Sequence, residues 1–149
     1  MPHAIIVDSL SQCIFVRYEG RSSLSEVLGV ITFLVEEPVY RQTYLRLHDF
    51  SRIDWQPTAK ELKRLADHSR MTRSRLTEDE RDKRRTAVLV GREVDFGLGR
   101  MTQAFADPPG GPTSEFRMCR TYADAAAYLG LPADDYDPFE QPGDAASGN

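Results

Sequence analysis

The sequence has little of what disulfide or metal stabilisation requires. It contains two cysteines, three histidines and one tryptophan among 149 residues. Cys13 and Cys119 lie in apolar, strand-like segments, so we expect two buried free thiols, and this cysteine usage predicts a cytoplasmic location. No apolar run approaches the roughly 20 residues of a membrane-spanning helix. The first residues carry neither a basic lead nor a small-residue cleavage site, so no signal peptide is expected.

The chain also lacks the residue sets of metal-dependent and catalytic sites. The pair His48 and Asp49 is typical of some metal phosphohydrolases, but such sites need further histidine and aspartate ligands. His3 and His68 are the remaining histidines, one at the terminus and one in a polar segment. We therefore predict no metal site, no cofactor and no enzymatic activity, with local hydrogen bonding as the role of His48 and Asp49.

A phosphoacceptor receiver domain is a second enzyme-like alternative. Asp8, Asp49 and Asp54 lie near the ends of predicted strands, where a receiver clusters its carboxylates. A receiver also needs a lysine after its last strand, and this sequence has Arg120 there. Loop and helix-capping roles therefore explain these three acids better.

What the sequence does have is a regular alternation of strand and helix patterns. Short runs rich in β-branched residues predict strands, and the first two form a hairpin that the pair Glu19-Gly20 ends. The strands are expected at Ala4–Asp8, Cys13–Tyr18, Thr43–His48, Thr86–Val90 and Glu115–Cys119. The stretch Asp49–Pro57 is interpreted as a loop.

Helix-start signals separate these strands. Two Ser/Thr-x-x-Glu capping boxes predict helices that begin after Ser23 and Thr58. Asp95 and Thr121 are the predicted caps of two more helices, the last of which Gly130 ends. The segment Thr77–Arg85, which is rich in charge, is either a short helix or mobile.

These elements predict one α/β domain over residues 1–132. The order β-β-α-β-α-β-α-β-α fits a mixed, mostly parallel sheet of about five strands with about four helices, in which the opening hairpin supplies an antiparallel edge. Residues 133–149 carry five acids and no base. We expect this acidic tail to be disordered, because its composition buries little apolar surface.

The middle of the chain is basic. Residues 60–85 include ten lysines and arginines against six acids. The stretch has no interleaved aromatic residues, so a solvated helix face explains it better than a nucleic-acid interface, and no nucleic-acid partner is expected. Contact with the acidic tail is an alternative.

Several strings, in this order, resemble one known family. They are the hairpin that ends at Gly20, the strand YLRLHDF, the run TAVLVG followed by FGLGRM, and the closing EFRMCRTYADAAAYLG. This pattern, over about residues 4–131, is similar to the SpoIIAA-like family within the STAS fold of anti-sigma-factor antagonists and transporter tails. The resemblance implies that fold and a regulatory role through protein–protein interaction.

In the switch proteins of that family, a serine at the start of the helix after the third strand is phosphorylated. The corresponding stretch here is Asp54–Thr58, which contains no Asp-Ser pair. Thr58 is the nearest hydroxyl, and capping its helix is the role we expect of it.

A binding surface is expected where the predicted parallel strands end. Trp55, in a loop beside a helix start, is either core, the lid of a hydrophobic pocket or an interface anchor. The glycines of FGLGRM are either a close helix contact or an anion site with the neighbouring arginines. The expected surface comprises Asp54, Trp55, Thr58, Arg92, Phe96, Gly97, Gly99 and Arg100.

The sequence therefore predicts a non-enzymatic binding or regulatory module with a protein partner. The alternative is a carrier or sensor of a small apolar or lipid-like ligand, which an apolar cavity near Ile31, Trp55 and Phe105 would favour. Self-association is a further expectation, because the first helix and the opening hairpin both leave apolar surface to cover.

Overall fold

The computed structural model describes residues 3–8, 12–41, 45–91 and 116–132. These residues form an α/β domain around one five-stranded mixed sheet. The predicted helix that begins near Asp95 and the acidic tail 133–149 lie outside the described residues, as does Thr43 at the start of the third predicted strand. None of the described helices is long and apolar enough to cross a membrane.

The strands follow one another across the sheet in chain order. Strand β1 pairs antiparallel with β2, whereas β2 with β3, β3 with β4 and β4 with β5 are parallel pairs. The predicted α/β class, with a hairpin as antiparallel edge, is confirmed. The strand bounds are β1 His3–Asp8, β2 Cys13–Arg21, β3 Leu45–Asp54, β4 Arg85–Leu89 and β5 Phe116–Cys119.

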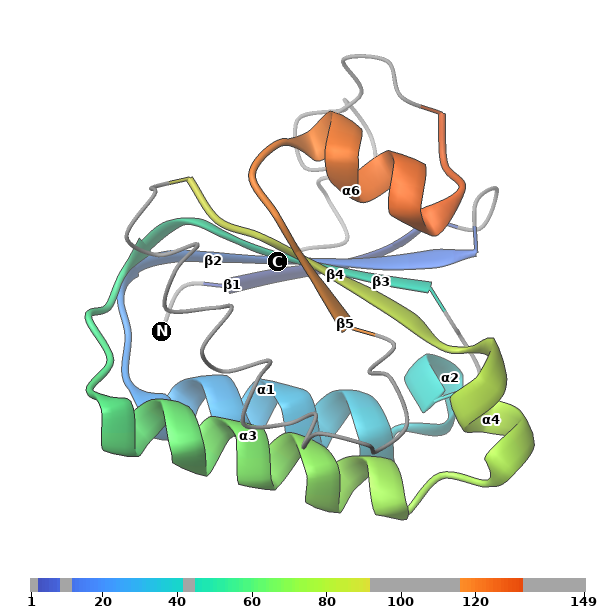
Figure 1. Cartoon of the computed structure of the whole chain (residues 1–149), viewed down its shortest axis with the longest axis horizontal. Helices are drawn as coiled ribbons and strands as arrows, with labels where there is room; N and C mark the ends of the chain where they lie inside the picture. Colours follow the sequence, from blue (N-terminus) through green and yellow to red (C-terminus); the bar gives the residue numbers. More distant parts are fainter. Residues whose placement is uncertain (1–2, 9–11, 42–44, 92–115, 133–149) are drawn as a thin grey trace.

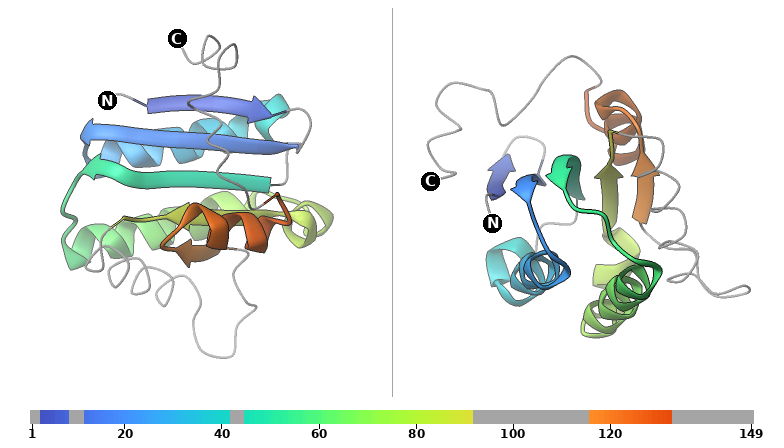
Figure 2. Two further views of the ribbon diagram at one scale, coloured as in Figure 1. Left: turned by 90° about the horizontal axis from the view of Figure 1, so that it is seen from above. Right: turned by 90° about the vertical axis from the view of Figure 1, so that its left-hand side faces the viewer.

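The helices cover the two faces of the sheet unequally. Four of them lie on one side, which we call the α1 face, and α6 lies on the other, the α6 face (Figures 1 and 2). The helix bounds are α1 Leu24–Glu36, α2 Pro38–Arg41, α3 Ala59–Ser74, α4 Glu78–Lys83 and α6 Tyr122–Leu129.

Each face of the sheet has its own hydrophobic core, because successive side chains of a strand point to opposite faces. On the α1 face, alternate residues of β2 pack against α1; this cluster comprises Ile14, Val16, Tyr18, Val30 and Leu34. On the α6 face, the intervening residues of the strands pack against α6; this cluster comprises Ile6, Cys13, Phe15, Leu47, Ala87, Cys119, Ala125 and Leu129. Both cysteines are buried free thiols, as predicted.

The helix starts predicted at Thr58 and Thr121 are confirmed by their hydrogen bonds. The Thr58 hydroxyl accepts from the Glu61 N–H at 3.1 Å, and the Glu61 carboxylate accepts from the Thr58 N–H at 3.0 Å. Thr121 accepts from the Asp124 N–H at 3.1 Å. Gly130 ends α6 at φ 75°, the left-handed region that glycine adopts readily.

The charged segment after α3 forms a short helix, which settles the alternative left open above. Thr77 and Glu80 form a third reciprocal capping box, with bonds of 2.9 and 3.1 Å. The short helix α4 follows this box and leads directly into β4.

Helices α1 and α3 are linked side by side on the α1 face. Thr32 Oγ1 lies 2.8 Å from His68 Nε2, and Arg75 lies 3.6 Å from the Glu36 carboxylate. Burial, together with the nearby Arg75 charge, lowers the pKa of His68. His68 is therefore a link between two helices rather than a ligand.

The predicted ends of two strands are wrong. Strand β2 continues through Glu19 and Gly20 to Arg21, and β3 continues through the predicted loop to Asp54. Gly20 has φ 70°, so its glycine character permits the local bend without ending the strand. Most of the added residues are polar, and Glu19 and Arg52 pair with each other, whereas Phe50 and Ile53 pack against the core of the α1 face.

Candidate functional site

The described residues at the carboxyl ends of β2, β3 and β4 form a candidate binding surface. These strands are parallel, so their carboxyl ends meet at one edge of the sheet, where α1 and α3 also begin (Figure 1). A hydrogen bond of 3.4 Å from the Ser22 N–H to the Asp54 carbonyl joins the two strand-to-helix turns. In open α/β sheets this edge is where ligands bind.

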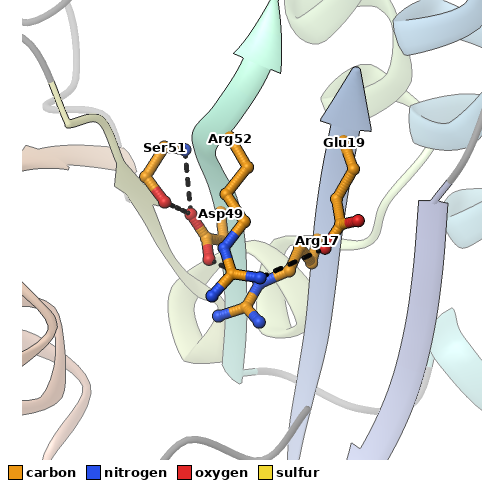
Figure 3. Close-up of polar contacts among 5 residues, drawn as sticks. All are labelled: Arg17, Glu19, Asp49, Ser51 and Arg52. Atoms are coloured by element: carbon orange, nitrogen blue, oxygen red, sulfur yellow. Dashed lines mark hydrogen bonds and ion pairs between the residues drawn. The ribbon is translucent and has the colours of Figure 1, made fainter. Parts of the chain in front are cut away.

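A buried ion pair lies at the centre of this edge, on the α6 face. Arg17 Nε donates to Asp49 Oδ2 at 2.9 Å, and the two side chains are only 10% and 2% exposed. The other carboxylate oxygen of Asp49 accepts from the Ser51 N–H at 2.9 Å and from the Ser51 hydroxyl at 2.5 Å (Figure 3). Asp49 therefore links Arg17 of β2 to the backbone of β3 at Ser51.

A second ion pair lies next to it in solvent. Arg52 Nη1 is 3.4 Å from Glu19 Oε1, and both side chains are about half exposed. The two ion pairs lie side by side: the Arg17–Asp49 pair is buried and the Arg52–Glu19 pair lies toward the solvent (Figure 3). We call Arg17, Glu19, Asp49, Ser51 and Arg52 the carboxyl-edge cluster.

A β-bulge places Arg52 in this cluster. Arg17 is opposite Asp49 whereas Glu19 is opposite Arg52, so β3 contains one residue more than β2 over this interval. The extra residue changes the face to which the following side chains point. As a result, the Arg52 side chain lies on the same face of the sheet as Glu19, whereas Phe50 and Ile53 pack against the core of the α1 face.

Gly91, directly after β4, brings a third strand end to the cluster. A Cβ added at Gly91 would lie 3.4 Å from Ser51 Cβ and 3.5 Å from the Ser51 carbonyl oxygen. These are ordinary van der Waals distances, so Gly91 lies beside Ser51 with room for a small side chain.

The structure places part of the predicted surface here. Asp54 is exposed at the end of β3, Trp55 is half-buried, and Thr58 caps α3. The remaining predicted residues lie outside the described part of the chain, namely Arg92, Phe96, Gly97, Gly99 and Arg100. Gly91 lies beside Ser51, so the described part of the β4 turn reaches the same edge as Asp54.

Arg17, Glu19, Ser51 and Arg52 are not among the predicted site residues. Arg17 lies inside the predicted strand Cys13–Tyr18, and Ser51 and Arg52 lie in the stretch that was interpreted as a loop. One signal was available: Arg17 and Asp49 are opposite charges near the ends of two predicted neighbouring strands, and charges within otherwise apolar strands require partners.

The opposite face of the same strands holds an aromatic and histidine network. The Tyr18 hydroxyl lies 3.0 Å from His48 Nδ1, and the Tyr18 ring stacks on Phe50 with centroids 4.3 Å apart. Burial, with contributions from the Arg46 and Arg84 charges, lowers the pKa of His48 to about 3, whereas burial raises the pKa of Tyr18. The neutral imidazole and the protonated phenol therefore share one buried hydrogen bond.

Arg46 is the largest side chain that is fully buried, at 1% exposed. Its guanidinium donates to the Tyr40 carbonyl at 2.7 Å and to the Leu34 carbonyl at 3.4 Å. These carbonyls belong to α2 and to the last turn of α1, which cannot use them internally. Arg46 thus fixes the carboxyl ends of two helices to the middle of the sheet.

We expect Arg46→Met to lower the free energy of unfolding by about 1.5–3 kcal/mol, the usual size for hydrogen bonds to a charged group. Urea unfolding followed by circular dichroism measures this. Arg21→Met, at an exposed strand end, is the matched control and should change stability by less than about 0.5 kcal/mol. Equal stability of the two variants would show that Arg46 does not hold the helix ends.

This edge presents charged and hydroxyl side chains, and the Cys13 thiol lies at the opposite end of β2. Burial, with a contribution from Asp8, raises the pKa of Cys13 to about 12, so this thiol stays protonated and unreactive. Among the described residues, no three histidine, cysteine, aspartate or glutamate side chains gather as metal ligands would. The described groups that can contact a partner at this edge are the Arg52–Glu19 pair, Ser51 and Asp54, with Trp55 as the adjacent aromatic side chain.

Comparison with protein-family models and with curated protein sequences finds no match to this chain.

Proposed function

We propose that this protein is a non-enzymatic binding or regulatory module of the STAS/SpoIIAA-like type, which binds a protein partner at the carboxyl edge of its sheet. The observation that supports this most directly is the carboxyl-edge cluster. Its buried half is rigid and its exposed half presents charge, and such an arrangement gives a partner a fixed electrostatic pattern to recognise.

Hydrogen bonding within the cluster supports a preorganised surface. Asp49 bonds to both the backbone and the side chain of Ser51, so the turn that carries Arg52 is fixed before any partner arrives. A surface that is already ordered loses little conformational entropy on binding. Trp55 lies one residue after Asp54 and is half-buried, which leaves part of its ring for contact.

The proposal is tested by affinity capture from the organism's own cells, followed by mass spectrometry. Arg52→Glu and Trp55→Ala should each reduce capture of the principal partner at least about tenfold, as loss of an interface anchor does. Met71→Lys, on α3 and away from the edge, is the control and should capture the partner normally. The proposal is wrong if both edge variants capture as much partner as the wild-type chain.

Native mass spectrometry of the same preparation distinguishes a carrier. A protein that carries a small apolar ligand would keep a reproducible extra mass of a few hundred daltons that denaturation removes. A clean protein mass together with a second polypeptide is the result that we expect.

A further inference from the structure

Strand β1 forms one edge of the sheet and has β2 as its neighbour in the described structure. Edge strands expose unpaired backbone N–H and C=O groups, and proteins usually protect them with lysine, proline or a bulge. The sequence of β1, HAIIVD, has neither lysine nor proline, and its register with β2 is regular from His3 to Asp8. Within the described part of the chain, the strand is therefore an open template for a further strand.

Apolar side chains accompany this open edge. Val7 is 41% exposed on β1, and Phe33 of α1 is 42% exposed. The Phe33 ring contacts Tyr40 of α2, with centroids 5.4 Å apart. In the left view of Figure 2, α2 lies beside α1 near the carboxyl end of β1, and both views show it on the side of α1 away from α3. Two large apolar side chains thus border the same edge of the molecule.

We propose that β1 pairs with β1 of a second copy of this chain, so that the two sheets join into one continuous sheet across a two-fold axis. A two-fold axis perpendicular to the sheet makes the two β1 strands antiparallel and keeps the α1 faces of both copies on the same side of the joined sheet. The proposal concerns a different edge from the carboxyl-edge cluster and does not depend on partner binding there.

The strand is complementary to itself in one register. In a continuous sheet, residues that face each other across two strands point to the same face. If the two-fold axis passes at Ile6, Val7 of each copy lies opposite Ile5 of the other, both on the α1 face. Ile5 already packs against the core of that face, so the exposed Val7 would extend the core of the second copy. Ile6 would meet Ile6 on the α6 face, where it belongs to the other core.

The same geometry explains why a second copy fits better than an unrelated strand. Joining the edges places the two α1–α2 layers next to each other beneath the extended sheet, and each brings an exposed Phe33. One interface then covers both apolar side chains and the open backbone edge, and closed two-fold pairing leaves no further β1 edge exposed.

Sedimentation equilibrium of the full chain, over a wide concentration range, tests this proposal. The wild-type chain is expected to be a dimer that dissociates on dilution. Val7→Lys is expected to weaken dimerisation about 100-fold or more, because it places a charge opposite an isoleucine at a buried edge. Val7→Gln, an uncharged second variant, should also weaken it, which keeps the test valid if Val7→Lys fails to fold.

Met71→Lys is the matched control. Met71 is 53% exposed on α3, so the same change is made at an exposed apolar residue away from β1. It should leave the dimer intact. A wild-type monomer at all concentrations would overturn the proposal, and so would a dimer that both Val7 variants form as tightly as the wild-type chain. Partner capture by the carboxyl edge is a separate measurement, so failure of one proposal is distinguishable from failure of the other.

Discussion

Asp49→Ala is expected to lower the free energy of unfolding by about 3–5 kcal/mol, the usual cost of removing one partner from a buried ion pair. The Arg17 guanidinium, nine-tenths buried, would lose the carboxylate that lies 2.9 Å away, and Ser51 would lose the acceptor of both its hydrogen bonds. Urea unfolding measures the change.

The neighbouring exposed pair supplies the control. Arg52→Ala removes an ion pair of the same chemical type in the same cluster, but both side chains are about half exposed, so the expected loss is about 0–1 kcal/mol. The double variant Arg17→Met/Asp49→Leu should recover much of the stability, because neither charge of this buried pair remains. If Asp49→Ala costs no more than Arg52→Ala, the buried pair does not stabilise this edge.

Acidification is expected to destabilise the fold through His48. The pKa of His48 falls from 6.5 to about 3 in the folded chain. Between pH 6.5 and about pH 3, the imidazole of His48 is therefore protonated in the unfolded chain and neutral in the folded chain. The free energy of unfolding should fall across this window by about 1.4 kcal/mol per pH unit from this residue alone.

His48→Phe isolates this contribution from that of the other titrating groups. The variant loses the hydrogen bond between the imidazole and the Tyr18 hydroxyl, so its absolute stability should fall by about 1–3 kcal/mol. Its stability should nevertheless depend less on pH between 6.5 and 3 than that of the wild-type chain. Urea unfolding at several pH values measures both slopes, and equal slopes would show that His48 is not buried as a neutral group.

The parts of the fold that depend on local chemistry were predictable from the sequence. Capping boxes at Ser23 and Thr58 gave the starts of α1 and α3, because a hydroxyl and a glutamate three residues apart satisfy backbone N–H groups without help from the rest of the chain. Runs rich in β-branched residues likewise predicted the positions of β1, β2 and β4, because such residues favour the extended backbone of a buried strand.

The parts that depend on contacts between distant residues were not predictable from local patterns. The carboxyl halves of β2 and β3 resemble loops because they are polar, and they are strands because Glu19 and Arg52 face each other across 33 positions of sequence. The bulge that aligns them leaves no local signature. The predicted surface near Asp54 and Trp55 falls at the same edge of the sheet as the carboxyl-edge cluster, but the prediction did not include the ion pairs of that cluster.

The bulge in β3 also means that this strand tolerates the loss of one residue better than the gain of one. Deleting one residue between Asp49 and Arg52 would remove the bulge, and in the regular register that results Arg52 would stay opposite Glu19 and Ile53 would stay on the α1 face. Inserting one residue would instead turn every later side chain of the strand to the opposite face unless a second bulge formed. In related sequences, single-residue gaps in this interval should therefore be more frequent than single-residue insertions.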